Sequence, residues 1–333
     1  MPKADSPNEL AASPVDASLA QRLAWRGEAA LVAGFWALAE RLGPDRASAF
    51  GSRLVAAIGP RSRKAKMVRA NLRVVRPEAS EAELARLVRA SFAHFGRVLG
   101  EFPHLGVLCE PPRAVVVDPL GLLAAARGRP SMFVSGHFAN WEISAGVAAR
   151  AGVPITVVHA TRANPLVTEL LLRRRSALGC RFLDRDASPA AMLREIRAGR
   201  SIGVLVDQRH DAGDLVPFFG RPASAPLAPA LLAARLDLPF VPVRVERLDG
   251  AAFRVTLCPP IAPDLSLGER RAIARDMMQR LYRLFEDWIR ERPEEWLCIK
   301  RRWPDLTKAK WRAKTARHVR AAQPDASEPV GRP

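Results

Sequence analysis

The spacing of hydrophobic residues divides the chain into two regions of different character. From Leu19 to about Leu108, apolar residues recur at helical spacing, most clearly in LVAGFWALAERL, FGSRLVAAIG and AELARLVRASFAHFGRVLGEF. Gly-Pro pairs separate these stretches, and Ser80 with Glu83 predicts a capping box at the start of the last one. The first region is therefore predicted to be a helical lobe.

After Pro112, short β-branched apolar runs alternate with helical stretches. This alternation is typical of βαβ units around a largely parallel sheet, so we predict an α/β core. Helices are expected after Trp141, Pro165, Ser188 and Ala225, and a last long helix over residues 267–291. The predicted strands are AVVVD, SMFVSG, ITVVHA, SIGVLVD, FVPVRVERL and FRVTLCPPI.

The chain is accordingly divided into four predicted parts. These are a disordered tail (1–20), a helical N-terminal lobe (21–108), an α/β core (109–305) and a basic flexible tail (306–333). No run reaches the roughly 18 uncharged apolar residues of a membrane-spanning helix. The apolar stretch at 29–39 is only about half that long, so it suits an interfacial membrane helix, although an amphipathic core helix gives the same pattern.

Composition narrows the possible partners. A net charge of +18 and a pI near 11.1 favour an acidic partner such as nucleic acid, an anionic membrane surface or an acidic carrier protein. The four cysteines are too scattered for a CxxC metal site or a disulfide framework, and we expect neither a metal nor a cofactor. No GxSxG, P-loop or GxGxxG motif supports a hydrolase, nucleotide-transfer or dehydrogenase function.

The segment SMFVSGHFANWEISAGVAAR carries the candidate chemistry. It places His137 just after a predicted buried strand and Glu142 in the first turn of the next helix, where ligands bind in open α/β sheets. A histidine there can take a proton from a hydroxyl, and a nearby carboxylate can orient its ring. Gly136 leaves room for close approach, and N–H groups at the helix start face a developing oxyanion. A structural histidine would show the same HxxxxE spacing.

The segment GHFANWE at 136–142 resembles the GHxxNWE signature of the bacterial lipid A biosynthesis acyltransferases. Other segments agree in the same order, so the similarity covers about residues 30 to 305. They are Asn71-Leu72 with Pro77-Glu78 (NL…PE), Gly96-Arg97 with Glu101 (GR…E), Asn164-Pro165 (NP), Val206-Asp207-Gln208 with 216–220 (DQ…VPFFG), and 293–303 (P..YLW.HRRF).

The resemblance implies a glycerolipid-acyltransferase-like fold, with a mixed, largely parallel sheet flanked by helices. It implies that His137 is the general base and Glu142 its partner. It also implies a fatty acyl donor carried by acyl carrier protein or coenzyme A, and an acceptor hydroxyl on a lipid A precursor, as in the lauroyl and myristoyl transferases. The expected location is the cytoplasmic face of the bacterial inner membrane, associated with it instead of spanning it.

Several further residues are expected to contact substrate. Asp207 and Gln208 end a predicted strand at the same sheet edge as His137, and two phenylalanines offer apolar walls for an acyl chain. Basic side chains near the C-terminus suit lipid phosphates or an acidic carrier. Strand-end capping, core packing and a solvated charged face are the structural alternatives. The expected substrate-contacting residues are Gly136, Asn140, Arg162, Asn164, Asp207, Gln208, Phe218, Phe219, Arg301 and Arg302.

Arg162 departs from the family pattern. Many members carry an arginine four residues before the NP motif, where this chain has Ala160, and Arg162 lies two residues closer to that motif. An oxyanion or phosphate role for Arg162 is therefore an expectation that depends on its reaching the same place.

Three alternative functions fit parts of the sequence. A nucleic-acid-binding protein fits the charge and the Lys310-Trp311-Arg312 run, but no helix-turn-helix, zinc-finger or RNP-like motif is present, and no nucleic acid is expected. The same acyl transfer onto a mannosylated inositol lipid, a lysophospholipid or an amino-acid lipid would leave the residues around His137 unchanged. A catalytically inactive scaffold is disfavoured because His137 and Glu142 are both present.

Overall fold

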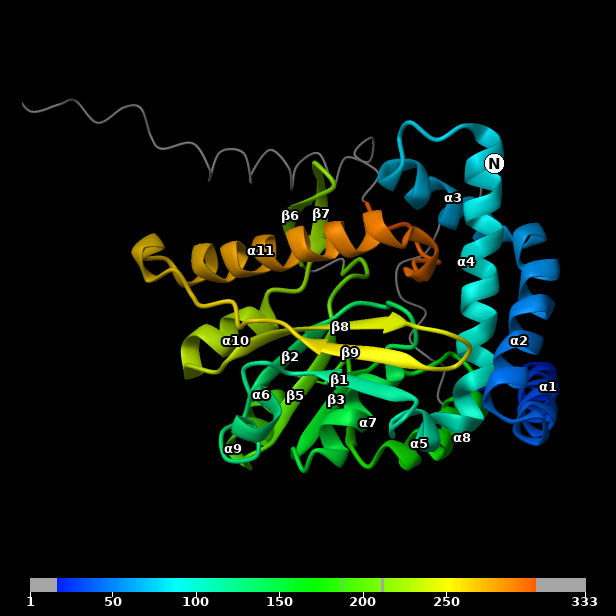
Figure 1. Cartoon of the computed structure of the whole chain (residues 1–333), viewed down its shortest axis with the longest axis horizontal. Coiled ribbons are helices and arrows are strands. Elements are labelled where there is room, and N and C mark those ends of the chain that lie inside the picture. Colours follow the sequence, from blue (N-terminus) through cyan, green and yellow to red (C-terminus); the bar gives the residue numbers. More distant parts are fainter. Residues whose placement is uncertain (1–16, 188, 211–212, 304–333) are drawn as a thin grey trace, which may run out of the picture.

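A computed structural model describes residues 17–187, 189–210 and 213–303 of the chain (Figure 1). Most of the predicted N-terminal tail, residues 1–16, and all of the predicted basic tail at 306–333 lie outside the described residues. The first helix already begins at Leu19, inside the segment predicted to be a tail, because Ser18 caps it by accepting a hydrogen bond from the Gln21 N–H.

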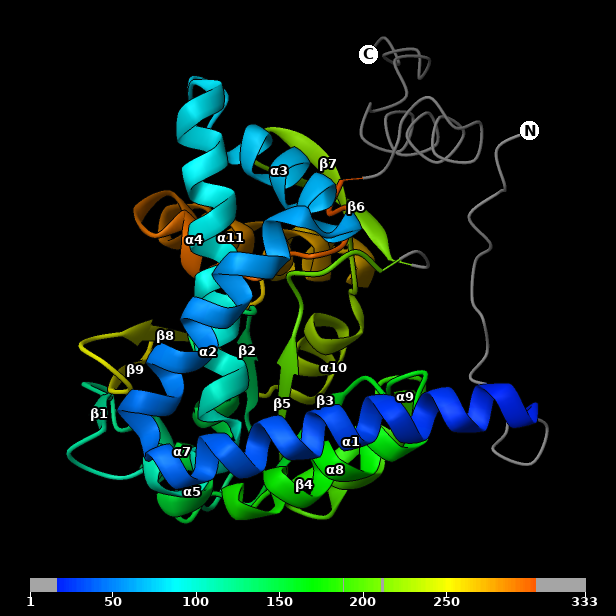
Figure 2. The same ribbon diagram turned by 90° about the vertical axis from the view of Figure 1, so that its right-hand side faces the viewer.

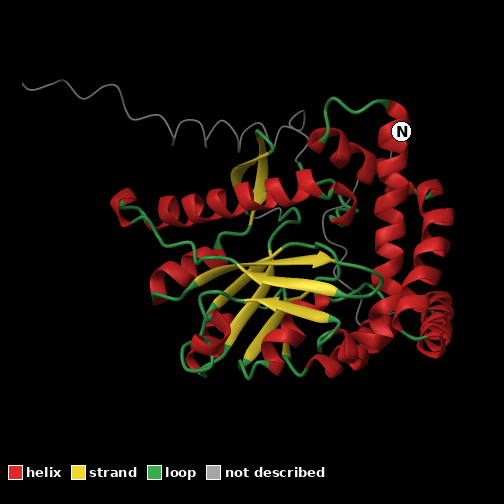
Figure 3. Ribbon diagram, viewed as in Figure 1, coloured by secondary structure: helices red, strands yellow, loops and turns green. Residues whose placement is uncertain are grey.

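A mixed sheet forms the centre of the molecule, with helices on both sides (Figure 3). All neighbouring strands run parallel except β8 and β9, which form an antiparallel hairpin. The predicted α/β fold with a largely parallel sheet is confirmed. In sheet order the seven strands are β1 (Ala114–Val117), β9 (Phe253–Leu257), β8 (Phe240–Arg247), β2 (Met132–Ser135), β5 (Ser201–Leu205), β3 (Ile155–His159) and β4 (Arg181–Asp184).

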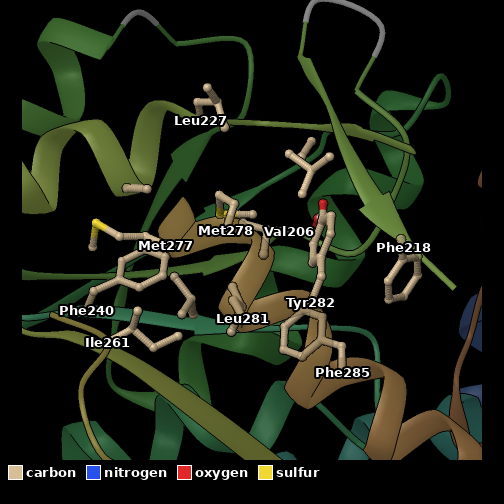
Figure 4. Close-up of a cluster of buried hydrophobic side chains, with 14 of the residues drawn as sticks. Val206, Phe218, Leu227, Phe240, Ile261, Met277, Met278, Leu281, Tyr282 and Phe285 are labelled. Atoms are coloured by element: carbon tan, nitrogen blue, oxygen red, sulfur yellow. The ribbon is translucent and has the colours of Figure 1, made fainter. Parts of the chain in front are cut away.

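Two hydrophobic clusters cover the two faces of this sheet. One cluster packs the sheet against α10 and α11. Helix α11 lies above the sheet in Figure 1, and Figure 4 shows the centre of the cluster around Phe240, Met277 and Tyr282. The other packs the opposite face against α6, α7 and part of α1. The helices of the core are α6 (Leu122–Ala125), α7 (Glu142–Arg150), α8 (Pro165–Arg175), α9 (Pro189–Arg197), α10 (Ala228–Leu236) and α11 (Arg270–Glu291).

The N-terminal lobe is helical, as predicted, and stands at one end of the sheet (Figures 1 and 2). The predicted capping box forms, since Ser80 and Glu83 exchange side-chain and backbone hydrogen bonds. The lobe consists of α1 (Leu19–Leu42), α2 (Pro44–Ile58), α3 (Arg63–Val75), α4 (Glu81–Glu101) and α5 (Leu105–Leu108). Short 3-10 turns lie at Gly59–Arg61, Phe102–His104, Ser176–Leu178, Leu265–Leu267 and Pro293–Glu295.

Glycines let α2 and α4 approach closely. A Cβ added at Gly96 would lie 2.1 Å from the Gly51 carbonyl oxygen, and one at Gly100 would lie 2.2 Å from that of Ala47. Because any side chain at these positions would push the helices apart, the contact requires glycine. It holds α4 upright beside α2 and fixes the C-terminal end of α4 near the sheet.

Two strand regions were not predicted. β4 follows Gly179 and forms one edge of the main sheet, and β6 (Asp214–Phe218) pairs with β7 (Arg221–Ala225) in a separate antiparallel hairpin. The hairpin turns at Phe219 and Gly220, both of which have positive φ. The hairpin packs on α11, and four of the five residues of β6 are buried.

Candidate active site

His137 stands at the carboxyl end of the central strand β2. The four residues of β2 are buried, and the chain then turns through Gly136. A Cβ added at Gly136 would lie 2.6 Å from the Phe138 ring and 3.1 Å from the Cβ of Asp207. The space that was expected to admit substrate is thus filled by the protein itself, and glycine is needed because β5 and Phe138 crowd this turn.

Asp207 holds His137 by two hydrogen bonds. Its Oδ1 lies 2.7 Å from Nδ1 of the ring, and its Oδ2 accepts from the His137 backbone N–H at 3.0 Å. The Trp296 indole N–H donates to the same Oδ2 at 2.9 Å. Asp207 follows β5, the parallel neighbour of β2, which explains why the two residues meet at one sheet edge. The predicted common edge of His137 and Asp207 is present in the structure.

The environment of Asp207 keeps it ionised. The carboxyl group is fully buried, which by itself raises its pKa, but the charge and hydrogen bonds of His137 and the Trp296 N–H outweigh burial and lower the pKa. An ionised carboxylate only accepts hydrogen bonds, so Nδ1 of His137 carries the proton. The lone pair is then on Nε2, which lies 3.2 Å from the Gln208 amide nitrogen. Nε2 is the atom that can receive a proton from a substrate hydroxyl.

The expected hydrogen bond between His137 and Glu142 is corrected by the structure. Within the described part of the chain, the Glu142 carboxylate receives Arg175 at both oxygens, at 2.5 and 2.8 Å, and the Trp141 indole N–H at 3.1 Å. Glu142 begins α7, whose first turn directs the carboxylate toward the end of α8. The Trp141 ring lies 4.8 Å from the His137 ring, so Glu142 reaches the histidine only through Trp141.

Arg175 is the partner that sequence reasoning missed. Its guanidinium lies 5.7 Å from the ring centres of both Phe102 and Phe182, and only 13% of its side chain is exposed. Burial tends to lower the pKa of Arg175, but the charge and hydrogen bonds of Glu142 raise it overall. The RRR run at 173–175 gave no signal for this, because its three arginines point to different surroundings: Arg173 and Arg174 form exposed pairs.

A buried network from the helical lobe fixes the loop after His137. Ala139 has a φ of 46°, its N–H donates to the Glu295 carbonyl, and its carbonyl lies 3.0 Å from Nε2 of His94. Asn140 donates to the Glu101 carboxylate at 2.9 Å, and Arg247 pairs with the same carboxylate. Asn140 is fully buried, so it is not exposed for the expected substrate contact. Its hydrogen bond to Glu101 instead holds the loop in place.

The NP motif joins the core to α1. Asn164 caps α8 through the Leu166 N–H, and its amide donates to the Trp25 carbonyl and the Glu28 carboxylate, each at 2.9 Å. Asn164 is 4% exposed, so the structure assigns it to packing of α1 on α8 instead of substrate contact (Figure 2). Arg162 precedes it on an exposed turn, where desolvation and the nearby Arg175 lower its pKa.

Among the remaining expected contacts, two side chains prove to be core. Phe218 is fully buried, stacked on Trp303, and Arg302 is fully buried between Phe218 and Tyr282, donating to the Tyr282 hydroxyl and the Ser224 carbonyl. The expected contact of Arg302 with lipid phosphate is therefore wrong. This buried side chain instead connects the C-terminal segment to the β6–β7 hairpin and to α11. A run of basic residues normally indicates a solvated surface, so the burial of Arg302 was not predicted from the sequence.

Phe219 and Arg301 lie nearer the surface. The Phe219 N–H donates to Glu286, and the Arg290 guanidinium lies 5.0 Å from the Phe219 ring centre. Arg301 is exposed. Among the described residues, Asp207 and Gln208 contact the His137 ring nitrogens and Trp141 lies beside the ring. The structure thus brings together His137, Asp207 and Gln208 from the expected set, with Gly136 in the turn before them.

Other features limit what the site contains. A cavity of about 590 Å³ lies between the β6–β7 hairpin, α10 and α11, and none of the residues around His137 lines it. The described residues hold no group of three or more metal-ligating side chains. In the same part of the chain, every helix falls short of the length and apolar character needed to cross a membrane.

A histidine oriented by a buried aspartate at the carboxyl edge of an α/β sheet is an arrangement that can take a proton from a hydroxyl placed beside it. The sequence model of the bacterial lipid A biosynthesis acyltransferase family matches residues 20–305, and the chain belongs to this family. A search among curated proteins finds no match. Family membership makes the protein an acyltransferase of lipid A-type biosynthesis, which takes an acyl donor and a lipid acceptor.

Proposed function

We propose that the protein moves a fatty acyl chain from an acyl carrier protein thioester to a hydroxyl of a lipid A precursor, with His137 as the general base. The observation that carries the proposal is the hydrogen bond between Nδ1 of His137 and buried Asp207, which leaves Nε2 as the acceptor. Coenzyme A is the alternative donor.

In the proposed reaction, Nε2 of His137 takes the proton of the acceptor hydroxyl as its oxygen attacks the thioester carbonyl carbon. The tetrahedral intermediate then expels the thiolate, which takes the proton back from the imidazolium. Asp207 stabilises the imidazolium that exists between these two steps, since its carboxylate lies 2.7 Å from Nδ1. Gln208 leaves Nε2 when the hydroxyl arrives, and its amide is then available to the substrate.

Glu142 supports this reaction indirectly in our proposal. Its ion pair with Arg175 and its hydrogen bond from Trp141 hold the Trp141 ring beside His137. In our proposal Glu142 therefore holds Trp141 in place beside the site, and Asp207 is the hydrogen-bonding partner of His137. Asp207 is a catalytic partner by contact, and Glu142 is a positioning residue.

We also propose that α1 lies in the surface of the cytoplasmic leaflet of the inner membrane. Four exposed leucines fall on one side of this helix, opposite the side where Trp25, Trp36 and Ala39 are buried against the protein. An apolar stripe of this kind on a strongly basic protein suits an anionic interface. The exposed leucines are Leu19, Leu23, Leu31 and Leu38.

The test is mass spectrometry of membrane lipids from cells that lack the gene. Cells complemented with the wild-type gene are expected to regain one acyl chain on a lipid A species, and cells complemented with His137→Ala are not. The mass of the regained chain reports lauroyl, myristoyl or another length. Restoration by His137→Ala would contradict the proposal, and a mass change confined to an inositol lipid or lysophospholipid would assign the same chemistry to that acceptor.

A further inference from the structure

The segment that follows α11 crosses the loop that carries His137. Phe138 and Trp296 form an isolated antiparallel bridge between the two. Beside this bridge, the Leu297 N–H donates to the His137 carbonyl at 2.8 Å. The His137 N–H donates to the Asp207 carboxylate at 3.0 Å, so both polar groups of the His137 backbone are held.

A distant helix fixes the chain just after Trp296. Asn71 on α3 donates its amide to the backbone carbonyls of Cys298 and Lys300, at 2.9 and 2.7 Å. Its Oδ1 accepts from the Arg302 backbone N–H at 3.1 Å. One buried side chain therefore sets the path of this segment, and the position of the Trp296 indole is fixed from outside the His137 loop.

The indole of Trp296 reaches the carboxylate that orients His137. Its N–H donates to Oδ2 of Asp207 at 2.9 Å, while Oδ1 lies 2.7 Å from Nδ1 of His137. The ring is buried and packs edge-on against Phe218 and Trp303, with 6.0 and 6.2 Å between ring centres. Packing alone does not require an N–H group at this position, because a phenylalanine ring would fill much of the same space.

The donors around Asp207 share one negative charge. Burial raises the pKa of the Asp207 carboxyl, and the charge and hydrogen bonds of His137 together with the Trp296 N–H lower it overall. Charge that the indole N–H stabilises at Oδ2 is less available at Oδ1, where the carboxylate would stabilise a protonated His137 ring. The indole thus helps to keep the carboxylate ionised and weakens its attraction for an imidazolium.

We propose that Trp296 is a positioning residue whose indole N–H limits how tightly Asp207 holds a protonated His137. This inference rests on the proposed acyl transfer, in which the imidazolium forms as the hydroxyl is deprotonated and then returns its proton to the departing thiolate. A carboxylate without the indole donor would favour the protonated ring before substrate binds. Protonation removes the lone pair of Nε2, so less of the protein would be ready to act as a base.

The first arm of the test follows the His137 ring without any substrate. Full-length protein with isotope-labelled histidine is titrated by nuclear magnetic resonance, and the His137 signal is identified by its absence from His137→Ala. In Trp296→Phe the midpoint of the His137 titration is expected to rise by about half a pH unit or more. The same rise is expected when benzothiophene replaces only the indole of Trp296, since sulfur then stands in place of N–H and the ring size is kept.

The matched control is Trp303→Phe. Trp303 is buried in the same aromatic cluster and donates its N–H to the Phe218 carbonyl at 2.9 Å, so the substitution removes one indole hydrogen bond that does not involve Asp207. The His137 midpoint is expected to stay at the wild-type value, and thermal unfolding compares the stability of the two variants. An equal shift in both variants would overturn the proposal. So would an unchanged or lower midpoint in the benzothiophene protein, which decides the matter if Trp296→Phe does not fold.

The second arm measures kcat/KM for acyl transfer as a function of pH. In Trp296→Phe the acid side of the profile is expected to move upward by the same amount as the titration midpoint, so activity falls more at low pH than at high pH. A uniform loss at every pH, with an unshifted ring titration, would make Trp296 a packing residue and contradict the proposal.

The two arms separate the role of Trp296 from the proposed function. If the wild type transfers no acyl chain at all, the proposed function fails, while the titration still decides whether Trp296 acts on His137 through Asp207.

Discussion

Asp207→Asn tests which carboxylate serves His137. In the wild type, Oδ2 of Asp207 accepts two N–H groups, from the His137 backbone and Trp296, and Oδ1 faces Nδ1–H of His137. An asparagine keeps the first two hydrogen bonds by placing its carbonyl oxygen at the Oδ2 position. Its NH2 group then faces Nδ1, which must give up its proton to accept from it. The imidazole is driven to the Nε2–H tautomer, which cannot take a proton from the substrate.

The size of the effect follows from this change of tautomer. The same substitution in a serine protease triad, which keeps the geometry and changes the tautomer, lowers kcat about 10⁴-fold, equivalent to ~5.5 kcal/mol in the barrier. We expect a loss of about 10³-fold to 10⁴-fold in kcat here, with a folded protein. The measurement is the initial rate of acyl transfer at saturating donor and acceptor, together with thermal unfolding of both proteins.

Glu142→Gln is the matched comparison, since it removes the carboxylate that the family resemblance assigns to His137. Because Glu142 bonds Arg175 and Trp141 and not the histidine, we expect kcat to fall much less than in Asp207→Asn. A kcat within about tenfold of the wild type in Asp207→Asn would refute the assignment of the partner role to Asp207. So would a Glu142→Gln variant that loses as much activity as Asp207→Asn while remaining folded.

Three other predictions concern the Glu142–Arg175 ion pair, the buried His94 and the exposed side of α1. Glu142→Gln leaves the buried Arg175 charge unpaired and is expected to lower the free energy of unfolding by about 3–5 kcal/mol, most of which Glu142→Gln/Arg175→Met should restore in denaturant titrations; equal stability of the two variants would contradict this. Burial and the charge of Arg247 lower the pKa of His94 from 6.5 to about 3 in the folded protein. Below pH 6.5 the unfolded chain therefore takes up a proton that the folded protein does not. The stability that neutral His94 provides is complete above pH 6.5 and is lost as the pH falls toward 3, at up to ~1.4 kcal/mol per pH unit. Unfolding curves of wild type and His94→Gln should therefore converge as the pH falls, and parallel curves would disprove the assignment. Leu31→Asp on the exposed side of α1 should weaken vesicle binding about tenfold or more without changing the melting temperature, and unchanged flotation would place α1 away from the membrane.

The parts of the site that depend on strand order were predictable from sequence. Apolar runs ending in Gly136-His137 and in Asp207-Gln208 predict two buried strands, and a parallel sheet brings their ends to one edge. The structure pairs Ser135 with Leu205 and so places the histidine beside the aspartate. What sequence could not supply was which of two nearby carboxylates reaches the ring, since that depends on the register of β2 and β5 and on the direction of the first turn of α7.

The positions that sequence misjudged share a physical cause. Arg175 and Arg302 lie in runs of basic residues, and such runs are normally solvated. Each is buried because aromatic rings surround its guanidinium and a carboxylate, hydroxyl or carbonyl accepts its N–H groups, contacts that come from elements distant in the chain. The β6–β7 hairpin was not predicted for a similar reason, because it depends on the pairing of β6 with β7 and on contacts with α11, which is distant in the chain.

The most direct test of the proposed chemistry uses purified protein, an acyl carrier protein thioester and a lipid A precursor. Free thiol and the added acyl mass on the lipid are followed together for the wild type and for His137→Ala. We predict equal amounts of thiol and acylated lipid from the wild type, and a rate about 10²-fold to 10⁴-fold lower without the imidazole. Thiol release without acylated lipid, or a folded His137→Ala protein that transfers the chain at the wild-type rate, would contradict the role of His137 as the base.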